Sequence, residues 1–395
     1  MKKDILFIIP SLSAGGGEKS LINLLEQIDY TQYNVDLFTL NKDGLFLDFV
    51  PNEVNIIENP KDLEVFKLSI LKSITKFLVN RNLRLAFNRG MFFIKNKLKI
   101  SVSKREQYSW KYIKGAIGVL DKKYDVAIGY LEKTSNYICI DCVQADKKIG
   151  WIHTDYNKLG ADKKFDKRYL SQLDYIVTVS EECAQVLKKE FNDLSKRIRI
   201  IKNIVSPSTI KKMSLENIDI KTINNEKIIV SVGRLSCEKG FDIAVKSCKI
   251  LKDRGLKVKW ILIGDGVEKA NIEKLINENK LMSDFILVGV KSNPYKYLSK
   301  ADIYVQPSRF EGKSIAMDEA KILGKPIVAT NFSTVRDQIN DKVDGIITEM
   351  NERSLADGIE LLINDSKLYS NIVNNMREMS LGTESEVNKL YELIK

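Results

Sequence analysis

Short apolar runs alternate with segments of helical periodicity along the whole chain. Seven runs fall in the first half, at residues 4–10, 34–40, 54–58, 125–130, 147–153, 174–180 and 197–201. Six more follow in the second half, at residues 227–233, 258–264, 284–290, 301–307, 326–330 and 345–349. Nearly continuous apolar strands are typical of sheets buried on both faces, and the helical segments between them favour parallel crossovers. The pattern predicts an α/β fold of two doubly wound parallel-sheet domains in tandem.

The length of the chain supports the same division. A chain of 395 residues is too long for one typical hydrophobic core. We expect an N-terminal domain over residues 1–203 and a C-terminal domain over residues 204–375. The polar stretch 206–226 is interpreted as the linker that separates them.

Composition indicates an ordinary globular protein, with 44% apolar residues and 7 prolines. Two lysines precede the first apolar run as in a signal peptide, but Asp4 interrupts it, and no run approaches the roughly 18 apolar residues that span a bilayer. We therefore expect a cytoplasmic location. The five cysteines indicate reduced thiols. Cys139 and Cys142 form a CxxC without the second pair that a structural zinc needs, which favours core packing.

The positive charge is concentrated in one segment, residues 61–115. The whole chain carries +11, and residues Lys61 to Lys114 alone hold 14 Lys and Arg against 3 acids. Apolar residues interleave with these cations, a mixture that suits basic amphipathic helices on an anionic membrane surface. An anionic acceptor, or core-packed helices with solvated basic faces, would have the same pattern. No nucleic-acid-binding motif accompanies the charge, so we do not expect nucleic acid as a partner.

Loops that follow strands are the places to look for chemistry, because open parallel sheets bind ligands beyond the carboxyl ends of their strands. Three glycines, Gly15 to Gly17, follow the first run and precede a helix. Glycine lets the backbone approach a ligand closely, and a helix N-terminus offers N–H groups to an anion. Arg234 and Lys239 follow the first run of the second half. Each half thus has a loop suited to phosphate, and a diphosphate would lie between them if the two crevices face each other.

Two common nucleotide motifs are incomplete. The dinucleotide fingerprint GxGxxG lacks its third glycine at both possible places, where Ser20 and Lys269 stand. Residues 311–314, EGKS, resemble the end of a P-loop, but Pro307 stands where the first glycine is required. These departures argue against a hydride-transfer enzyme and against an NTPase.

The segment SRFEGKSIAMDEAKILGKP, residues 308–326, gathers charged groups around the start of a predicted helix. Ser314 is a natural N-cap, and the helix is expected to end at Gly324. Glu311 and Glu319 would lie about 7 to 8 Å apart along the axis. They could accept hydrogen bonds from two groups of hydroxyls on one elongated ligand. They could equally complement the helix macrodipole, at a few tenths of a kcal/mol each.

The stretch FEGKSIAMDEA resembles the E-x7-E signature of the retaining glycosyltransferases of family 4, whose GT-B fold consists of two facing Rossmann-like domains. Further segments are similar to family segments and occur in the family's order: IIPSLSAGGGEKSLINL, WIHTDY, IIKNIV, VSVGRLSCEKGFD, LIGDG and LVGV. The resemblance covers nearly the whole chain and implies a GT-B fold. It also implies that a C-terminal helix, residues 376–395, returns to the N-terminal domain.

The resemblance implies a role for each residue that matches a family motif. Glu319 would bind the ribose and Glu311 the hydroxyls of the transferred sugar, while Arg234 and Lys239 would neutralise the diphosphate. The N–H groups of Gly16, Gly17, Ser314 and Ile315 would assist at the phosphates, Val290 would contact the base through its backbone, and His153, the only histidine, would lie beneath the reacting carbon. The expected catalytic residues are therefore His153, Glu311, Arg234 and Lys239.

The implied activity is a retaining, metal-independent transfer of a hexose or N-acetylhexosamine. The donor would be a nucleotide-diphosphate sugar, with a UDP-sugar favoured, and the acceptor a glycan or lipid-linked molecule in bacterial surface-polysaccharide synthesis. No D-x-D triplet that would recruit a metal occurs, so Arg234 and Lys239 would stabilise the leaving phosphate, and no cofactor is expected. A nucleotide-sugar epimerase, a phosphorylase of similar fold and a non-catalytic nucleotide-sugar binder are the alternatives. Lys313 and Ser314 depart from the family pattern, in which an aromatic and a small apolar residue often follow E-G, and they leave the sugar specificity open.

Overall fold

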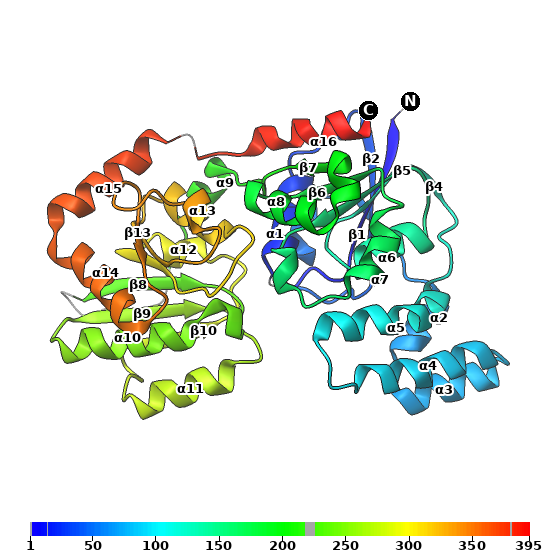
Figure 1. Ribbon diagram of the computed structural model, residues 1–395, viewed down its shortest axis with the longest axis horizontal. Helices are drawn as coiled ribbons and strands as arrows, with labels where there is room; N and C mark the ends of the chain where they lie inside the picture. Colours follow the sequence, from blue (N-terminus) through cyan, green and yellow to red (C-terminus); the bar gives the residue numbers. More distant parts are fainter. Residues whose placement is uncertain (1, 14, 218–225, 380) are drawn as a thin grey trace. The chain divides into compact units, whose positions relative to one another are not determined.

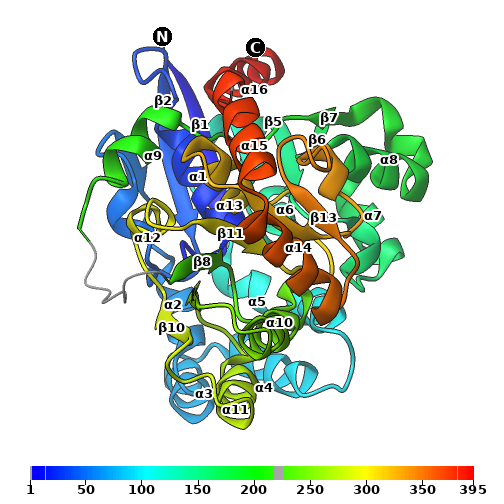
Figure 2. The same ribbon diagram turned by 90° about the vertical axis from the view of Figure 1, so that its left-hand side faces the viewer.

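The computed structural model describes residues 2–13, 15–217, 226–379 and 381–395. The chain forms two compact units (Figures 1 and 2). The first comprises Met1–Ser13, Gly17–Lys202 and Ser385–Lys395, and the second comprises Ala14–Gly16 and Asn203–Glu384. Among the described residues no helix is both long and apolar enough to cross a bilayer.

The first unit is built on a parallel sheet of seven strands in the order β3-β2-β1-β4-β5-β6-β7. Its strands are β1 (Lys3–Ile9), β2 (Tyr33–Thr39), β3 (Val54–Ile56), β4 (Lys123–Gly129), β5 (Gln144–Ile152), β6 (Tyr175–Thr178) and β7 (Ile198–Ile200). The strand order reverses between β1 and β4, and ligands of doubly wound sheets bind beyond such a reversal. The glycine loop follows β1 and is therefore at the expected binding edge.

The second unit has a parallel sheet of six strands in the order β10-β9-β8-β11-β12-β13. Its strands are β8 (Lys227–Val232), β9 (Val258–Ile263), β10 (Phe285–Gly289), β11 (Ile303–Gln306), β12 (Ile327–Thr330) and β13 (Ile346–Thr348). The reversal here lies between β8 and β11. Arg234 follows β8 and Glu311 follows β11, so the two loops singled out in this half flank one binding edge. All thirteen predicted strands are confirmed.

Helices separate the strands in both units. In the N-terminal half they are α1 (Gly16–Leu25), α2 (Lys61–Lys67), α3 (Ile70–Val79), α4 (Leu83–Asn96), α5 (Val102–Ile117), α6 (Thr134–Asp141), α7 (Lys163–Leu170) and α8 (Glu181–Glu190). In the C-terminal half they are α9 (Pro207–Met213), α10 (Phe241–Asp253), α11 (Lys269–Glu278), α12 (Tyr295–Leu298), α13 (Ile315–Ile322), α14 (Glu352–Asn364), α15 (Ser366–Glu378) and α16 (Val387–Ile394). Short 3-10 helices are η1 (Leu47–Phe49), η2 (Tyr156–Lys158), η3 (Asn192–Arg197), η4 (Cys237–Lys239), η5 (Val335–Asp337) and η6 (Glu384–Glu386).

The apolar runs form strands because both of their faces are buried. Residues Ile5 to Ile9 of β1 are all buried, so successive side chains enter cores on opposite sides of the sheet. The second unit likewise has two separate apolar cores, one around Trp260 and the other around Tyr304. Cys139 and Cys142 are buried in the first unit's core, which confirms the packing role predicted for them.

The interpretation of residues 206–226 as a linker is wrong for their first part. α9 begins with Pro207 at its first turn, and its Ile210 is buried in the second unit's core. α9 packs against α12 and α13. Apolar side chains at one helical spacing, Ile210 and Met213, were sufficient for packing although the stretch is mostly polar. Residues 218–225 lie outside the described part of the chain.

The predicted C-terminal helix over 376–395 is divided in the structure. Residues 376–378 complete α15 of the second unit, and α16 lies on the first unit. Tyr391 of α16 stacks on Tyr33 of β2 with ring centroids 5.2 Å apart, and its hydroxyl accepts from the N–H of Asp29 at 2.8 Å. The chain therefore ends on the unit in which it began.

Candidate functional site

Glu311 is fixed by hydrogen bonds in the loop that follows β11. Its Oε1 accepts from Ser308 Oγ at 2.7 Å and from Gln306 Nε2 at 3.0 Å. The third donor is Lys239 Nζ, at 2.6 Å, which comes from the loop after β8. Glu311 is only 8% exposed, so three donors compensate a largely buried carboxylate. Two residues predicted separately from sequence, Lys239 and Glu311, thus form one ion pair.

Gln306, at the end of β11, organises the polar groups beneath this pair. Its Oε1 accepts from the hydroxyl of Tyr304 at 2.5 Å and from Ser314 Oγ at 3.2 Å, while its Nε2 donates to Ser308 and Glu311. Gln306 is fully buried, and each of its amide atoms has partners. Sequence reasoning missed this residue, although its place at the end of an apolar strand was a usable signal.

The helix that bears Glu319 begins as predicted but is capped differently. Ser314 occupies the N-cap position of α13, yet its hydroxyl donates to Gln306 and caps nothing, which corrects the expected capping role. Its N–H donates to Gln338 Oε1 at 2.8 Å, and Gln338 Nε2 donates back to the carbonyl of Ser314 at 2.8 Å. Ile315 is the first residue of the helix. The phosphate contact expected of the Ser314 N–H requires Gln338 to release it.

Lys313, the departure from the family pattern, forms an ion pair within this segment. Its Nζ lies 3.0 Å from Asp318 Oδ2, and both side chains are mostly buried. Asp318 Oδ1 also accepts from Gln338 Nε2 at 2.9 Å. Lys313 therefore fastens the loop to the first turn of α13 in this structure.

Glu319 lies deeper than Glu311. It is 1% exposed, and its Oε1 accepts from the hydroxyl of Tyr295 in α12 at 2.9 Å. Burial, and then the charges of Glu311 and Glu319, raise the pKa of Tyr304 well above its usual value. The charges of both glutamates therefore affect the same buried tyrosine hydroxyl. Tyr295 follows the loop after β10 that contains Val290, and it was not identified from the sequence.

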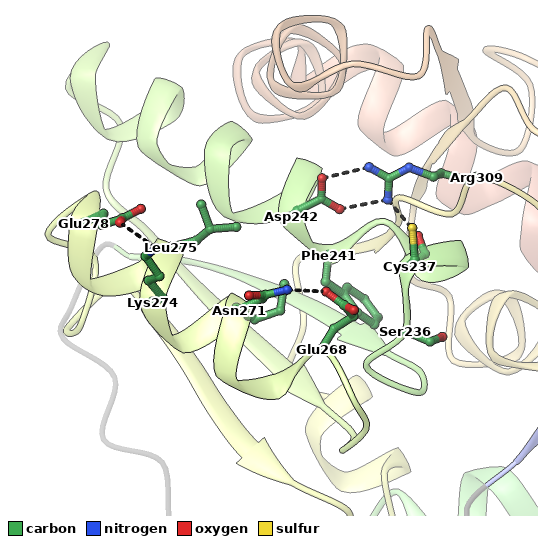
Figure 3. Close-up of a pocket in the computed structure, with 11 residues that line it drawn as sticks. Ser236, Cys237, Phe241, Asp242, Glu268, Asn271, Lys274, Leu275, Glu278 and Arg309 are labelled. Carbon is green, nitrogen blue, oxygen red and sulfur yellow. Dashed lines mark hydrogen bonds and ion pairs between the residues drawn. The ribbon is translucent and has the colours of Figure 1, made fainter. Parts of the chain in front are cut away.

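The loops after β8 and β11 pack directly on each other. Gly240 has φ +65°, and a Cβ there would lie 2.0 Å from the carbonyl oxygen of Pro307, so only glycine fits. Arg309 forms two parallel hydrogen bonds with Asp242, at 2.8 and 2.7 Å, and donates to the carbonyl of Cys237 at 2.7 Å (Figure 3). Burial opposes ionisation of Asp242, but Arg309 outweighs it and lowers the pKa of Asp242. These contacts hold Lys239 beside Glu311.

A cavity of about 330 Å³ lies between the start of α10 and α11, and Arg309 forms part of its wall (Figure 3). Its wall includes Cys237, Asp242 and Glu268, but neither Lys239 nor the two glutamates. The cavity is therefore separate from Lys239, Glu311 and Glu319.

Arg234 is exposed, and the described residues contain no ion pair for its guanidinium. Val290 directly follows β10 and is exposed.

In the first unit the glycine loop meets the histidine-bearing loop. A Cβ on Gly17 would lie 2.5 Å from a methyl of Leu131 and 3.9 Å from the ring of His153, so the start of α1 lies close to both side chains. At Gly16 a side chain would meet no atom within 4 Å among the described residues. Gly17 and His153 therefore lie close together beyond the carboxyl ends of β1 and β5.

Two hydrogen bonds fix the position of His153. Its Nε2 lies 2.9 Å from the carbonyl oxygen of Tyr130, and its own N–H donates to Glu132 Oε2 at 3.1 Å. A carbonyl only accepts, so Nε2 carries a hydrogen and donates it to Tyr130.

The chain is similar in sequence to known glycosyltransferases. Residues 214–379 match the family model described as "Glycosyl transferases group 1". The chain is 25% identical over 370 residues to the N-acetylgalactosamine-N,N'-diacetylbacillosaminyl-diphospho-undecaprenol 4-alpha-N-acetylgalactosaminyltransferase of Campylobacter jejuni, covering 93% of this chain and 92% of that protein. It is 26% identical over 259 residues to the poly(ribitol-phosphate) alpha-N-acetylglucosaminyltransferase of Staphylococcus aureus, covering 62% and 50%.

Solved structures share the fold over the full length. A mutant of TarM from S. aureus, in complex with fondaparinux, alpha-GlcNAc-glycerol and UDP, superposes with a TM-score of 0.69 at 18% identity and covers all of both chains. WaaG, a glycosyltransferase involved in lipopolysaccharide biosynthesis, superposes with a TM-score of 0.65 at 12% identity and covers 99% of both chains. The two parallel-sheet, Rossmann-like units thus have the GT-B fold.

Proposed function

Because this chain is a glycosyltransferase with the GT-B fold, we propose that it transfers a hexose or N-acetylhexosamine from a UDP-sugar to a glycan or lipid-linked acceptor, in bacterial surface-polysaccharide synthesis. Transfer proceeds with retention and without a metal. The first unit takes the acceptor and the second takes the donor. The observation that carries the proposal is the Lys239–Glu311 ion pair, because it joins the two loops at the reversal of strand order in the second unit. Relatives that act on undecaprenol-linked and polyol-phosphate acceptors, and a UDP-bound neighbour, support the substrate classes.

Lys239 and Arg234 stabilise the leaving diphosphate. Cleavage of the bond between sugar and phosphate develops negative charge on the phosphate, and positioned cations lower that barrier. Lys239 Nζ is already held in place by Glu311, and the exposed Arg234 is available to a ligand that enters the same loop. The N–H group of Ile315, at the start of α13, supplements these cations.

The two glutamates hold different parts of the donor. Glu319 accepts from ribose hydroxyls and keeps Tyr295 as its protein partner, while the backbone of Val290 receives the base. Glu311 accepts from hydroxyls of the transferred sugar. Three donors on its Oε1 make Glu311 a well-stabilised carboxylate and hence a weak nucleophile, which favours front-face retention over a covalent intermediate.

Substitution of the two glutamates separates these roles. Glu319→Gln is expected to weaken UDP binding roughly 10- to 100-fold, because a charged hydrogen-bond acceptor is lost. Glu311→Gln should leave UDP affinity nearly unchanged but reduce kcat roughly 100- to 1000-fold. Titration calorimetry with UDP and a transfer assay with a labelled UDP-sugar measure the two effects. The exposed Glu349→Gln is the matched control. Equal losses of UDP affinity in both variants would contradict the assignment.

The same preparation distinguishes the alternatives. Thermal-shift measurements with UDP- and GDP-sugars identify the base, because a ligand that binds the native state raises Tm. Labelled UDP-sugar incubated without acceptor would be isomerised by an epimerase and not by a transferase. Activity that is lost in EDTA and restored by a divalent cation would overturn metal independence.

A further inference from the structure

The most unusual surface of the molecule is the α3–α4 hairpin, residues 70–96, with the connection 97–101 and the first turn of α5, residues 102–105. Among the described residues, ten of the exposed large apolar side chains lie within residues 71–102, against eight in all the rest. The ten are Leu71, Leu78, Val79, Leu83, Phe87, Phe93, Ile94, Leu98, Ile100 and Val102. Apolar exposure so concentrated indicates a surface that meets another apolar phase.

The hairpin is folded by a different set of side chains. Phe77 of α3 and Leu85 of α4 are buried with Phe66 of α2, and Phe92 of α4 packs edge-on against Phe66 with ring centroids 5.3 Å apart. The guanidinium of Arg89 lies over the Phe66 ring at 5.4 Å. α3 and α4 thus bury one apolar stripe against α2 and α5, on the side of α5 away from the sheet (Figure 1).

A second apolar stripe faces outward on each helix. In α3, Leu71 and Leu78 are seven residues apart and lie on one face, 77% and 50% exposed. In α4, Leu83 and Phe87 are four apart and Ile94 continues the same face. A surface helix needs one apolar stripe to fold, so the outer stripes are not explained by the fold.

The segment that bears these outer stripes is rich in cations and contains no acid. Residues 70–105 contain ten Lys and Arg and no Asp or Glu. The ten are Lys72, Lys76, Arg81, Arg84, Arg89, Lys95, Lys97, Lys99, Lys104 and Arg105. Within the described chain none of them forms an ion pair with an acid, although many lysines elsewhere do. These cations are therefore available to an anionic partner.

Apolar side chains with interleaved, unpaired cations match one kind of partner. A second copy of this chain would set ten cations against ten at a two-fold interface, which like-charge repulsion disfavours. A soluble anionic polymer would satisfy the cations but would leave the outer stripes in water. An anionic bilayer satisfies both, because acyl chains take the apolar side chains and headgroups take the cations.

We propose that the outer face of the α3–α4 hairpin docks on an anionic lipid bilayer, with Leu71, Leu78, Leu83 and Phe87 entering the headgroup boundary and Lys72, Lys76, Arg81 and Arg84 lying among the phosphates. This places the first unit at the membrane surface, where a lipid-linked acceptor would be met. The proposal is independent of the donor chemistry in the second unit.

Cosedimentation with lipid vesicles tests the surface. Wild-type protein should bind vesicles of phosphatidylcholine mixed with phosphatidylglycerol and not vesicles of phosphatidylcholine alone, and added sodium chloride should weaken binding. Each cation removed should weaken binding roughly fivefold. The double variant Lys72→Glu/Lys76→Glu should therefore lose most association, and Leu78→Ser/Phe87→Ser likewise. Lys188→Glu/Lys189→Glu on α8 and Val119→Ser are matched exposed controls that should bind like the wild type.

Tryptophan fluorescence reports insertion directly. The three native tryptophans, Trp110, Trp151 and Trp260, are buried and contribute a constant background. Leu78→Trp should shift to the blue on phosphatidylglycerol vesicles and be quenched by brominated acyl chains, whereas Val119→Trp should not.

Three results would overturn the proposal. One is unchanged binding of both hairpin double variants, and another is equal binding to phosphatidylcholine alone. The third is tight binding of soluble polyphosphate together with absence of vesicle binding, which would identify a polymer-binding surface instead. The UDP affinity of the same variants should equal that of the wild type. This measurement distinguishes a failure of the membrane proposal from a failure of the proposed transferase function.

Discussion

At the scale of single residues, the structure turns predicted ligand groups into partners of one another. Glu311 and Lys239 were singled out from separate loops, and they form an ion pair at 2.6 Å. Lys313 pairs with Asp318. A buried charge must be compensated, and Arg309, Glu311 and Lys313 in the loop after β11 each have an oppositely charged partner. Binding of a diphosphate would then exchange the partner of Lys239 for the phosphate.

The reactivity of Cys237 tests how accessible the loop after β8 is. Burial raises the pKa of Cys139, Cys142 and Cys248 to about 12, and also raises that of Cys183, whereas Cys237 is exposed in η4. A thiolate is the reactive form, so at mildly alkaline pH only Cys237 should react with a disulfide reagent in the native protein.

The measurement is a thiol titration before and after unfolding in urea. It should count one fast thiol in the native protein and five after unfolding, and Cys237→Ser should remove the fast one. Saturating UDP should slow the reaction of Cys237, because that residue lies between Arg234 and Lys239. A rate insensitive to UDP would count against a phosphate site in this loop.

At the scale of elements, α13 shows how a helix start is built from distant groups. Its N-terminal segment is held by Gln338, which follows η5 and contacts the N–H and carbonyl of Ser314 as well as Asp318. The sequence pattern correctly located the helix between Ser314 and Gly324. It did not identify Gln338, because that residue is 24 positions away and has no local signature.

Removal of the Gln338 side-chain amide should lower the stability of the second unit. Gln338→Ala is expected to lower the free energy of unfolding by about 2 to 3 kcal/mol, since buried groups of Ser314 lose their partners. Urea denaturation followed by circular dichroism measures the change. Gln185→Ala, on the exposed face of α8, should change the free energy by less than about 0.5 kcal/mol and serves as the control. An effect of similar size in both variants would show that the Gln338 contacts are not structural.

At the scale of the whole molecule, the chain closes on itself through α16. Leu390 is fully buried, and Lys3 Nζ donates to the carbonyl of Ile394 at 2.9 Å, so the two ends of the sequence stabilise the same unit. The apolar spacing of α16 was visible in the sequence. Its separation from α15 near residue 379 was not, because both segments have helical periodicity.

Truncation of one buried side chain in α16 tests this closure. Leu390→Ala should lower the free energy of unfolding of the first unit by about 3 kcal/mol, through lost burial and the cavity left behind. Glu392→Ala on the exposed face of the same helix should be nearly neutral. Calorimetry of thermal unfolding resolves the two units if they melt separately. An unchanged Tm of the first unit in Leu390→Ala would show that α16 does not stabilise that unit.

The sequence by itself determined the thirteen strands, the division into two α/β units and the loops that bear Gly17, His153, Lys239, Glu311 and Glu319. These follow from local signals: continuous apolar runs, glycines before helices, and charged residues directly after strands. Tertiary structure alone decided which of those residues meet. It assigned Tyr295 to Glu319, Gln338 to Ser314 and Arg309 to Asp242, and it made α9 part of a core rather than a linker. It also left the outer stripes of the α3–α4 hairpin exposed. Contacts between residues far apart in the chain depend on how helices and strands pack, and no local pattern of residues specifies that packing.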